Sequence, residues 1–313
     1  MGEHVTRQTP KAMPSAKMVE NYNKNMPKAF LVAGSRGTAT ARNVAPTYDI
    51  HSKYQFTSGS LAQLQGKHLY LYIHGYNVTA EGALGVGRDF FRSLHTALSN
   101  DGQDTAKAEY LLFTWPGDTG TAYFNDAQQY AQYAGVALFE LLRDCQAAPP
   151  LAISIITHSL GAHVALRGLS VLGERLYHHK ATLRVNHVLL LGAAIEHDVF
   201  SRPTRQEEYH FPDAAFGMNA LHMVISRSDN VLSAGFRVNE QDLALGFSGP
   251  ETMDTLVSLA RRVMEVLAKT FTFELHDFST TSATIMDPEL HVREHGGYWR
   301  SAKQVDYYVN FLG

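Results

Sequence analysis

The sequence has little cysteine and no long hydrophobic run. Cys145 is the only cysteine among 313 residues, which excludes an internal disulfide and a zinc site made of several thiolates. No apolar run approaches the roughly 20 residues of a membrane-spanning helix, and residues 1–25 are polar, without the hydrophobic segment of a signal peptide. We therefore predict a soluble, cytoplasmic protein without a membrane span.

An excess of either charge is also missing. Lysine and arginine number 27 and aspartate and glutamate 30, so the formal net charge is −3 at pH 7. This balance gives no basic surface for nucleic acid or for an anionic membrane. The 16 histidines are scattered, without an HExxH motif or another set at ligand spacing, so we expect neither a metal nor another cofactor.

The chain contains enough apolar residues for a large core, at 45 % of the total. Short apolar runs alternate with longer amphipathic segments, which predicts βαβ units and hence an α/β fold, a mainly parallel sheet with helices on both faces. The predicted strands are 30–33, 68–73, 110–115, 153–157, 185–191, 221–226 and 271–278. The predicted helices are 79–98, 126–143, 161–172, 251–268 and a C-terminal helix that opens at a capping box of Ser301 and Gln304.

Three segments do not follow this alternation. Residues 1–27 are rich in lysine, methionine, asparagine and proline without a period, so we expect a flexible N-terminal arm before a single domain at 28–313. Residues 196–217 and 231–250 have no clear period and contain several phenylalanines and leucines. We interpret these two segments as a small lid-like insertion or as the walls of an apolar pocket.

The most informative stretch is Leu151 to Leu166, LAISIITHSLGAHVAL. A β-branched apolar run from Ile153 to Thr157 predicts a buried strand, and a helical pattern begins directly after Gly161, so Ser159 lies on a turn from strand to helix. A tight turn of this kind holds a serine hydroxyl above a sheet, and the following helix directs free N–H groups toward it. Ser159 is therefore a candidate nucleophile.

An activated serine also needs donors for the developing oxyanion. The sequence His74-Gly75-Tyr76-Asn77 follows a predicted strand, and its glycine allows the backbone to approach a substrate. We expect the backbone N–H groups of Tyr76 and Leu160 to form the oxyanion hole, with His74 and Gly75 beside the substrate. The alternative is that this tetrapeptide is a simple turn.

The acid of a catalytic triad has three candidates. Asp229 follows the strand that ends near residue 226, whereas Glu196 and Asp198 follow the preceding strand. Asp229 is favoured because it lies early in its loop and keeps the chain order serine, aspartate, histidine. An Asx turn with Asn230 is the structural alternative for this residue.

The base also has three candidates, His276, His291 and His295. His276 lies inside a predicted strand, where packing is the expected role. His295 begins HGGYW, whose two glycines allow a loop to curl back toward the sheet, so it is favoured over His291. His158 and His163 flank the serine in sequence, but a tight turn directs their side chains away from it, so we expect packing or supporting roles.

Taken together, HGYN, TWPGD, THSLGAHVAL, SRSDNVL, ALGFSGP and EHGGYW resemble the α/β-hydrolase superfamily, and in particular a bacterial esterase/lipase-like group with HGYN, WP and HSxG motifs. The resemblance runs from Ala29 to the C-terminus. It implies Ser159 as nucleophile, Asp229 as acid and His295 as base. Trp115 and Asp118 match the WP loop of this group, which either lines the pocket or only caps a strand. Thr157 stands where the common superfamily pattern has glycine.

These observations predict a serine hydrolase that cleaves small-molecule carboxylic esters through an acyl-enzyme intermediate. The same groups would serve a thioesterase or an acyltransferase, and a hydrolase fold that only binds a ligand or a partner is the non-catalytic alternative. A dehalogenase or an epoxide hydrolase is disfavoured because these enzymes need a carboxylate in place of Ser159. The acyl length and the oligomeric state are not predicted.

Overall fold

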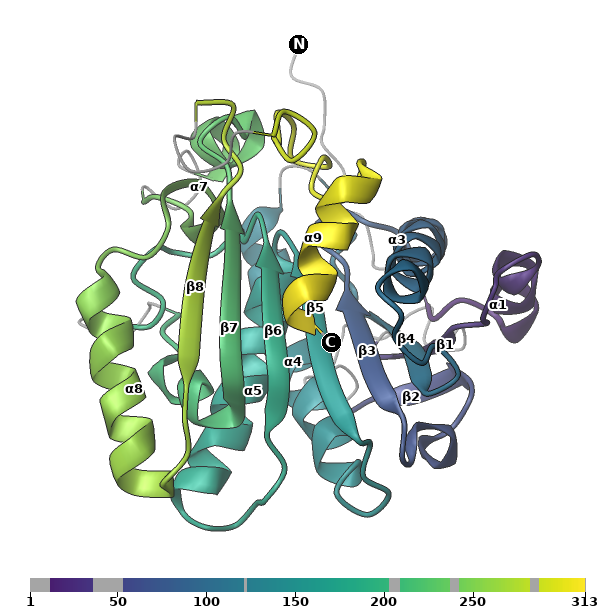
Figure 1. The fold of residues 1–313 in the computed structure, drawn as a ribbon, viewed down its shortest axis with the longest axis horizontal. Helices are drawn as coiled ribbons and strands as arrows, with labels where there is room; N and C mark the ends of the chain where they lie inside the picture. Colours follow the sequence, from purple (N-terminus) through teal and green to yellow (C-terminus); the bar gives the residue numbers. More distant parts are fainter. Residues whose placement is uncertain are drawn as a thin grey trace.

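An eight-stranded sheet forms the centre of the protein in the computed structural model, which describes residues 12–35, 53–120, 123–202, 209–236, 242–281 and 287–312 (Figure 1). The strands lie in the order β2-β1-β4-β3-β5-β6-β7-β8. Only the β1–β2 pair at the edge is antiparallel, so the prediction of a mainly parallel sheet is confirmed. The strands are β1 Leu31–Gly34, β2 Gln55–Ser58, β3 His68–Ile73, β4 Ala108–Thr114, β5 Ala152–His158, β6 Val185–Leu191, β7 Met218–Ile225 and β8 Thr272–Asp277.

Helices cover both faces of the sheet. In Figure 1, α3 and α9 lie in front of the strands and α4 and α5 lie behind them. The front layer consists of α1 Ala16–Asn23, α3 Ala80–Asn100 and α9 Ala302–Leu312, and the rear layer of α4 Phe124–Asp144, α5 Gly161–Tyr177 and α8 Met253–Leu267. Shorter turns of helix are η1 Leu61–Leu64, η2 Pro212–Gly217, η3 Val231–Phe236 and α7 Leu245–Ser248.

Burial on both faces explains why the central strands are continuously apolar. In β3, Leu69, Leu71 and Ile73 pack in the rear core, whereas Tyr70 and Tyr72 pack in the front core. All five side chains are at most 1 % exposed. Because burial of each large apolar side chain contributes about 2 kcal/mol, the sheet is a rigid platform for the loops at its carboxyl edge.

Capping residues visible in the sequence mark the starts of two front helices. The Thr79 hydroxyl accepts a hydrogen bond from the Gly82 N–H at 3.0 Å at the start of α3. At the start of α9, the Ser301 N–H donates to the Gln304 side chain at 3.1 Å, and the Ser301 hydroxyl accepts from the Lys303 N–H at 3.1 Å. The predicted capping box is therefore confirmed.

Part of the segment expected to be a flexible N-terminal arm is helical. Residues 16–23 form the helix α1, whose N-cap Ser15 accepts a hydrogen bond from Met18 N–H and whose Val19 is 1 % exposed. The Asn23 side chain both donates to the Phe30 carbonyl and accepts from the Phe30 N–H, at 2.9 Å each. These contacts fix α1 on the domain, while residues 1–11 lie outside the described part of the chain.

The two segments expected to form a lid or pocket wall are packed on the domain where they are described. Residues 203–208 and 237–241 lie outside the described ranges. In the remainder, an isolated bridge pairs Glu196 with Ala244, and Phe200, Phe211 and Phe236 are buried. Among helices in the described residues, none is both long and apolar enough to cross a membrane.

Candidate active site

Ser159 lies on a strained turn between β5 and α5. Its φ of +54° is in the left-handed region, which costs a residue other than glycine about 1–3 kcal/mol. Its N–H donates to the Leu191 carbonyl at 3.0 Å, and its carbonyl accepts from the Ala162 N–H at 3.1 Å. Backbone contacts on both sides therefore hold the strained conformation, as expected of a turn that presents a nucleophile.

Two glycines allow the β3 loop to lie against this turn. A Cβ atom on Gly75 would stand 2.7 Å from the Ser159 Cβ, and one on Gly161 would stand 2.6 Å from the Ile73 carbonyl oxygen. Both distances are shorter than real side chains allow, so any larger residue would push the loop and the serine apart. By contrast, Thr157 lies within β5, paired with Ile73 and Leu190, where a β-branched side chain fits.

The structure brings His295 and Asp229 together. His295 Nδ1 lies 2.8 Å from Asp229 Oδ2, and the Tyr298 hydroxyl donates to the same oxygen at 3.1 Å. The other oxygen of Asp229 accepts from the N–H groups of Val231 at 3.0 Å and Leu232 at 3.1 Å. Burial alone would raise the pKa of this fully buried carboxyl, but the contacts with His295, Leu232 and Tyr298 outweigh it and lower the pKa.

The alternative acids lie elsewhere. Asp198 Oδ2 is 3.9 Å from Nε2 of His210, and its backbone belongs to the turn in which Ser201 N–H bonds Asp198 O. Glu196 pairs through its backbone with Ala244 in the bridge described above. Of the three candidate acids, Asp229 is thus the one in contact with His295.

The alternative bases also have other surroundings. His276 lies in β8 on the face covered by α9, where its Nδ1 is 3.1 Å from the Tyr307 hydroxyl. His291 lies in a turn with its N–H bonded to the Pro288 carbonyl at 3.3 Å, and its side chain is near enough to Asp287 to act on that carboxyl. The structure therefore places His295, and neither of these two residues, on the Asp229 carboxylate.

His158 supports the candidate base, a contact that the sequence did not indicate. Its Nε2–H donates to the His295 carbonyl at 2.7 Å, and the two rings lie 4.7 Å apart. The Trp299 ring meets the His158 ring edge to face at 4.8 Å. Burial, together with the neighbouring His295, lowers the pKa of His158 to about 3, so the ring remains neutral.

Tyr298 is a second residue that the sequence analysis missed. Its ring lies against Gly192, whose φ is +52° and where a Cβ would stand 2.4 Å from the ring. This close approach aims the Tyr298 hydroxyl at Asp229. Its place in HGGYW, three residues after His295, was the available signal, but its direction depends on the fold of the loop.

The loop that carries Tyr76 is held at both ends. The Asn77 N–H donates to the Gly117 carbonyl at 2.9 Å, and the Tyr76 hydroxyl donates to the Gly120 carbonyl at 2.5 Å. Within the described residues, the backbone N–H groups of Tyr76 and Leu160 have no hydrogen-bond acceptor. Leu160 is also the N-cap of α5, so the positive end of the helix dipole lies beside Ser159.

His74 and Trp115 differ from their expected place beside the substrate. Both side chains are fully buried, and their rings stack at 5.6 Å. The Trp115 N–H donates to His74 Nε2 at 3.2 Å, and its indole N–H donates to the His74 carbonyl at 2.7 Å. We therefore correct the expectation: these two side chains brace the loops after β3 and β4 from within, and Gly75 alone of the predicted binding residues adjoins Ser159.

Aromatic side chains from three segments form a series of ring contacts that starts at Tyr76. The Phe124 ring, at the start of α4, meets the Tyr76 ring edge to face at 5.2 Å. The Phe236 ring, from η3, meets Phe124 at 5.9 Å. These contacts give the loop that carries Tyr76 an apolar wall.

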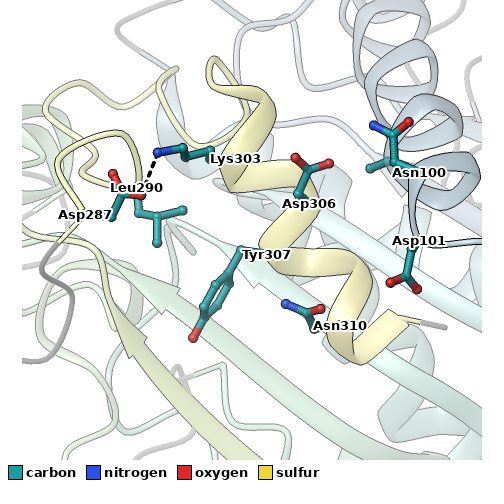
Figure 2. Close-up of a pocket in the computed structure, with 9 residues that line it drawn as sticks. Asn100, Asp101, Asp287, Leu290, Lys303, Asp306, Tyr307 and Asn310 are labelled. Atoms are coloured by element: carbon teal, nitrogen blue, oxygen red, sulfur yellow. Dashed lines mark hydrogen bonds and ion pairs between the residues drawn. The ribbon is translucent and has the colours of Figure 1, made fainter.

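A separate hollow lies on the front layer, between the end of α3, the turn at 287–290 and α9 (Figure 2). It has a volume of about 410 Å³, and an ion pair of 2.9 Å between Lys303 and Asp287 borders it. Its lining is mostly polar and includes Asn100, Asp101, Asp306 and Asn310. No residue of the candidate triad contributes to this hollow.

Comparison with known proteins decides the family. Residues 52–278 match the family described as "Alpha/beta hydrolase of unknown function (DUF900)". The chain belongs to this family. The matched range contains Ser159 and Asp229 and ends before His295.

Several solved structures that are similar to this chain are esterases. An esterase of Pyrococcus furiosus is 15 % identical, with 79 % of this chain and 84 % of that chain covered and a TM-score of 0.37. Esterase B of Lactobacillus rhamnosis is 14 % identical, with 83 % and 77 % covered and a TM-score of 0.38. The esterase domain of a Rhodothermus marinus protein is 14 % identical, with 80 % and 86 % covered and a TM-score of 0.35. The search of curated proteins gave no match.

Proposed function

We propose that this protein is a serine hydrolase that cleaves carboxylic esters of small molecules through an acyl-enzyme intermediate. The observation that supports it most is the pairing of two features at one edge of the sheet. Ser159 has a strained left-handed backbone after β5, and His295 is hydrogen-bonded at 2.8 Å to the buried Asp229 after β7. Acyl transfer requires a serine on a strained turn and a histidine oriented by a carboxylate, and both are present at the carboxyl edge of this sheet.

Each residue then has a defined task. His295 accepts the Ser159 proton through Nε2 as the hydroxyl attacks the ester carbonyl, because Nδ1 is committed to Asp229. Asp229 remains ionised, since the hydrogen bonds that it accepts lower its pKa, and it stabilises the imidazolium that forms. His295 next returns the proton to the leaving alcohol, and a water molecule activated by the same ring releases the acid.

The oxyanion of the tetrahedral intermediate needs two donors. The N–H groups of Tyr76 and Leu160 supply them, each contributing about 3 kcal/mol in the transition state. Phe124, which packs against Tyr76, and Phe236, which packs against Phe124, suit an apolar acyl group. The proposed substrates are therefore esters with an aliphatic or aromatic acyl chain.

Labelling with a fluorophosphonate probe tests the proposal directly. We expect the probe to label Ser159, identified by peptide mapping, and p-nitrophenyl butyrate to be hydrolysed. Ser159→Ala should abolish labelling and lower kcat by about 10⁴-fold or more. Ser99→Ala removes an exposed hydroxyl at the end of α3 and is the matched control, which should keep wild-type labelling and turnover.

Two results would contradict the proposal. Equal turnover by Ser159→Ala and wild type would assign the reaction to other residues. Absence of labelling and of turnover in protein with a normal circular dichroism spectrum and unfolding transition would favour a hydrolase fold that only binds a ligand. Turnover of a thioester far above that of the matched oxygen ester would move the activity to a thioesterase.

A further inference from the structure

The sheet face beneath α9 carries a row of histidines that the proposed reaction does not use. His68, His187, His222 and His276 come from β3, β6, β7 and β8. Their neighbours Tyr70, Leu189, Val224 and Phe278, two residues along each strand, belong to the front core, so the four histidines face the same layer. Adjacent rings in the row lie 5.9 Å apart between His187 and His222, and again between His222 and His276.

Strand geometry brings an acidic residue to one end of this row. His222 is in register with Glu274 on the neighbouring strand, and Glu274 and His276 are two residues apart on β8. All three side chains therefore extend from one face of the β7–β8 pair. Glu274 Oε2 lies 3.5 Å from His222 Nδ1 and 3.5 Å from His276 Nε2.

Three of the four imidazole nitrogens in this cluster are buried without a hydrogen-bond partner among the described residues. These three are both ring nitrogens of His222 and Nε2 of His276. The side chains are only 7 % and 10 % exposed, whereas Glu274 is 59 % exposed. Buried nitrogens without partners destabilise a fold, so their presence here points to a ligand that fills the gap.

The spacing fits a metal ion. One ligand atom from each of the three residues lies within 4.8 Å of the other two. Ligands about 2.1 Å from a tetrahedral zinc ion stand about 3.4 Å apart. Both distances to Glu274 match this separation, and a small inward movement of the two imidazole rings would bring their nitrogens to the same separation.

Neighbouring residues already orient the two rings. The Tyr307 hydroxyl is 3.1 Å from His276 Nδ1, and Figure 2 shows this side chain extending from α9 toward the strands. If Nδ1–H donates to Tyr307, Nε2 keeps its lone pair for the cluster. The Phe311 ring stacks on His222 at 4.2 Å and on His276 at 5.0 Å, which fixes both planes.

We propose that His222, Glu274 and His276 bind a zinc ion between β7 and β8 beneath α9, with water in the remaining coordination position. Two imidazoles and one carboxylate suit zinc, whereas magnesium and calcium prefer oxygen ligands alone. The site is independent of the proposed esterase reaction. The sequence did not indicate it because only Glu274 and His276 are close in the chain, and His222 joins them through strand pairing.

Zinc binding to the purified full chain tests this proposal. After treatment with EDTA and its removal, we expect wild type to bind one equivalent of Zn²⁺ in equilibrium dialysis and to unfold at a higher temperature with Zn²⁺ than without it. Glu274→Gln keeps the shape of an exposed side chain and should weaken binding at least 10-fold. His222→Phe and His276→Phe should remove the bound equivalent.

Matched controls separate the cluster from nonspecific binding. His178→Ala with His179→Ala removes two exposed histidines after α5 and should keep the equivalent of zinc. Labelling of Ser159 by the fluorophosphonate probe should be unchanged in Glu274→Gln, which reports an intact fold. Equal zinc binding by wild type and Glu274→Gln, or loss of zinc in the double control variant alone, would overturn the proposal.

Discussion

Histidines gather in two regions of the same sheet, and the two regions treat them differently. At the carboxyl edge, His295 Nδ1 is bonded to Asp229 and His158 Nε2 to the His295 carbonyl. Beneath α9, the nitrogens of His222 and Nε2 of His276 have no such partners in the described part of the chain. In the first region protein groups pair with the imidazoles, and in the second the proposed zinc ion takes that place.

A buried polar group has a different meaning in the two regions. A buried imidazole whose nitrogens are bonded to protein groups is explained by the role of those groups, here the orientation of a base. A buried imidazole with spare nitrogens next to a carboxylate requires another explanation. Mutations in the first region should therefore have the largest effects on activity. Mutations of buried histidines that have only some of their hydrogen-bond partners should instead change the free energy of unfolding.

Among variants that keep Ser159, Asp229→Asn should lower kcat the most. The amide cannot stabilise the imidazolium and favours the wrong tautomer of His295, so kcat should fall by about 10³–10⁴-fold with little change in KM. Turnover of p-nitrophenyl butyrate and the rate of fluorophosphonate labelling measure this effect.

Tyr298→Phe is the matched control for this variant. It keeps the ring against Gly192 and removes only one of the hydrogen bonds that Asp229 accepts. We expect kcat to fall by about 10-fold or less, because the contact with His295 and the two backbone donors remain. A larger loss in Tyr298→Phe than in Asp229→Asn would show that Asp229 is not the acid.

The sequence predicted best where burial leaves a clear pattern. The strands at 68–73 and 185–191 have the predicted bounds because both of their faces are covered. The edge strand Gln55–Ser58 was missed, since each of its side chains is only partly buried and its sequence is polar. The helix α1 was missed because eight residues form a helix only when tertiary contacts hold them.

In the candidate site, too, the sequence indicated positions along the chain but not the contacts that depend on tertiary structure. Ser159, Asp229 and His295 each follow a strand or precede a helix, so their positions in the chain indicated a shared edge of the sheet. The contacts of His158 with His295 and of Tyr298 with Asp229 depend on how residues 290–298 fold back, which no local pattern encodes. The burial of Trp115 and His74 also depends on a tertiary contact, between the loops after β3 and β4, and was not visible in the sequence.

His158→Phe tests whether His158 positions the base, and its expected effect on kcat is of intermediate size. The ring packing against Trp299 is kept, but the His295 carbonyl loses its donor, so the base loop becomes less well positioned. We expect kcat to fall by about 10- to 100-fold, corresponding to about 1–3 kcal/mol. His158→Gln, which carries a donor, should recover part of the loss, and equal activity of both variants and wild type would contradict a positioning role.

His163 is intermediate between the two groups of histidines, because only one of its ring nitrogens has a hydrogen-bond partner. Its replacement should have the smallest effect of these predictions, and that effect should be on stability. The Gln132 amide donates to its Nε2 at 2.7 Å, while its Nδ1 is buried without a partner in the described residues. Burial, with a contribution from Arg167, lowers the pKa of His163 from 6.5 to about 3. Between these values the unfolded chain takes up a proton that the folded protein does not, so the free energy of unfolding falls as the pH falls below 6.5.

This one residue should account for up to about 1 kcal/mol of that fall per pH unit. His163→Phe keeps a ring against Tyr209 and Phe211 and cannot titrate, so its free energy of unfolding should decline less between pH 6.5 and pH 5. Urea unfolding at both pH values measures the difference, and His178→Ala, which removes an exposed histidine, is the control that should keep the wild-type slope. Parallel slopes for wild type and His163→Phe would mean that the buried ring takes up its proton in the folded state, through an opening of the contact with Gln132.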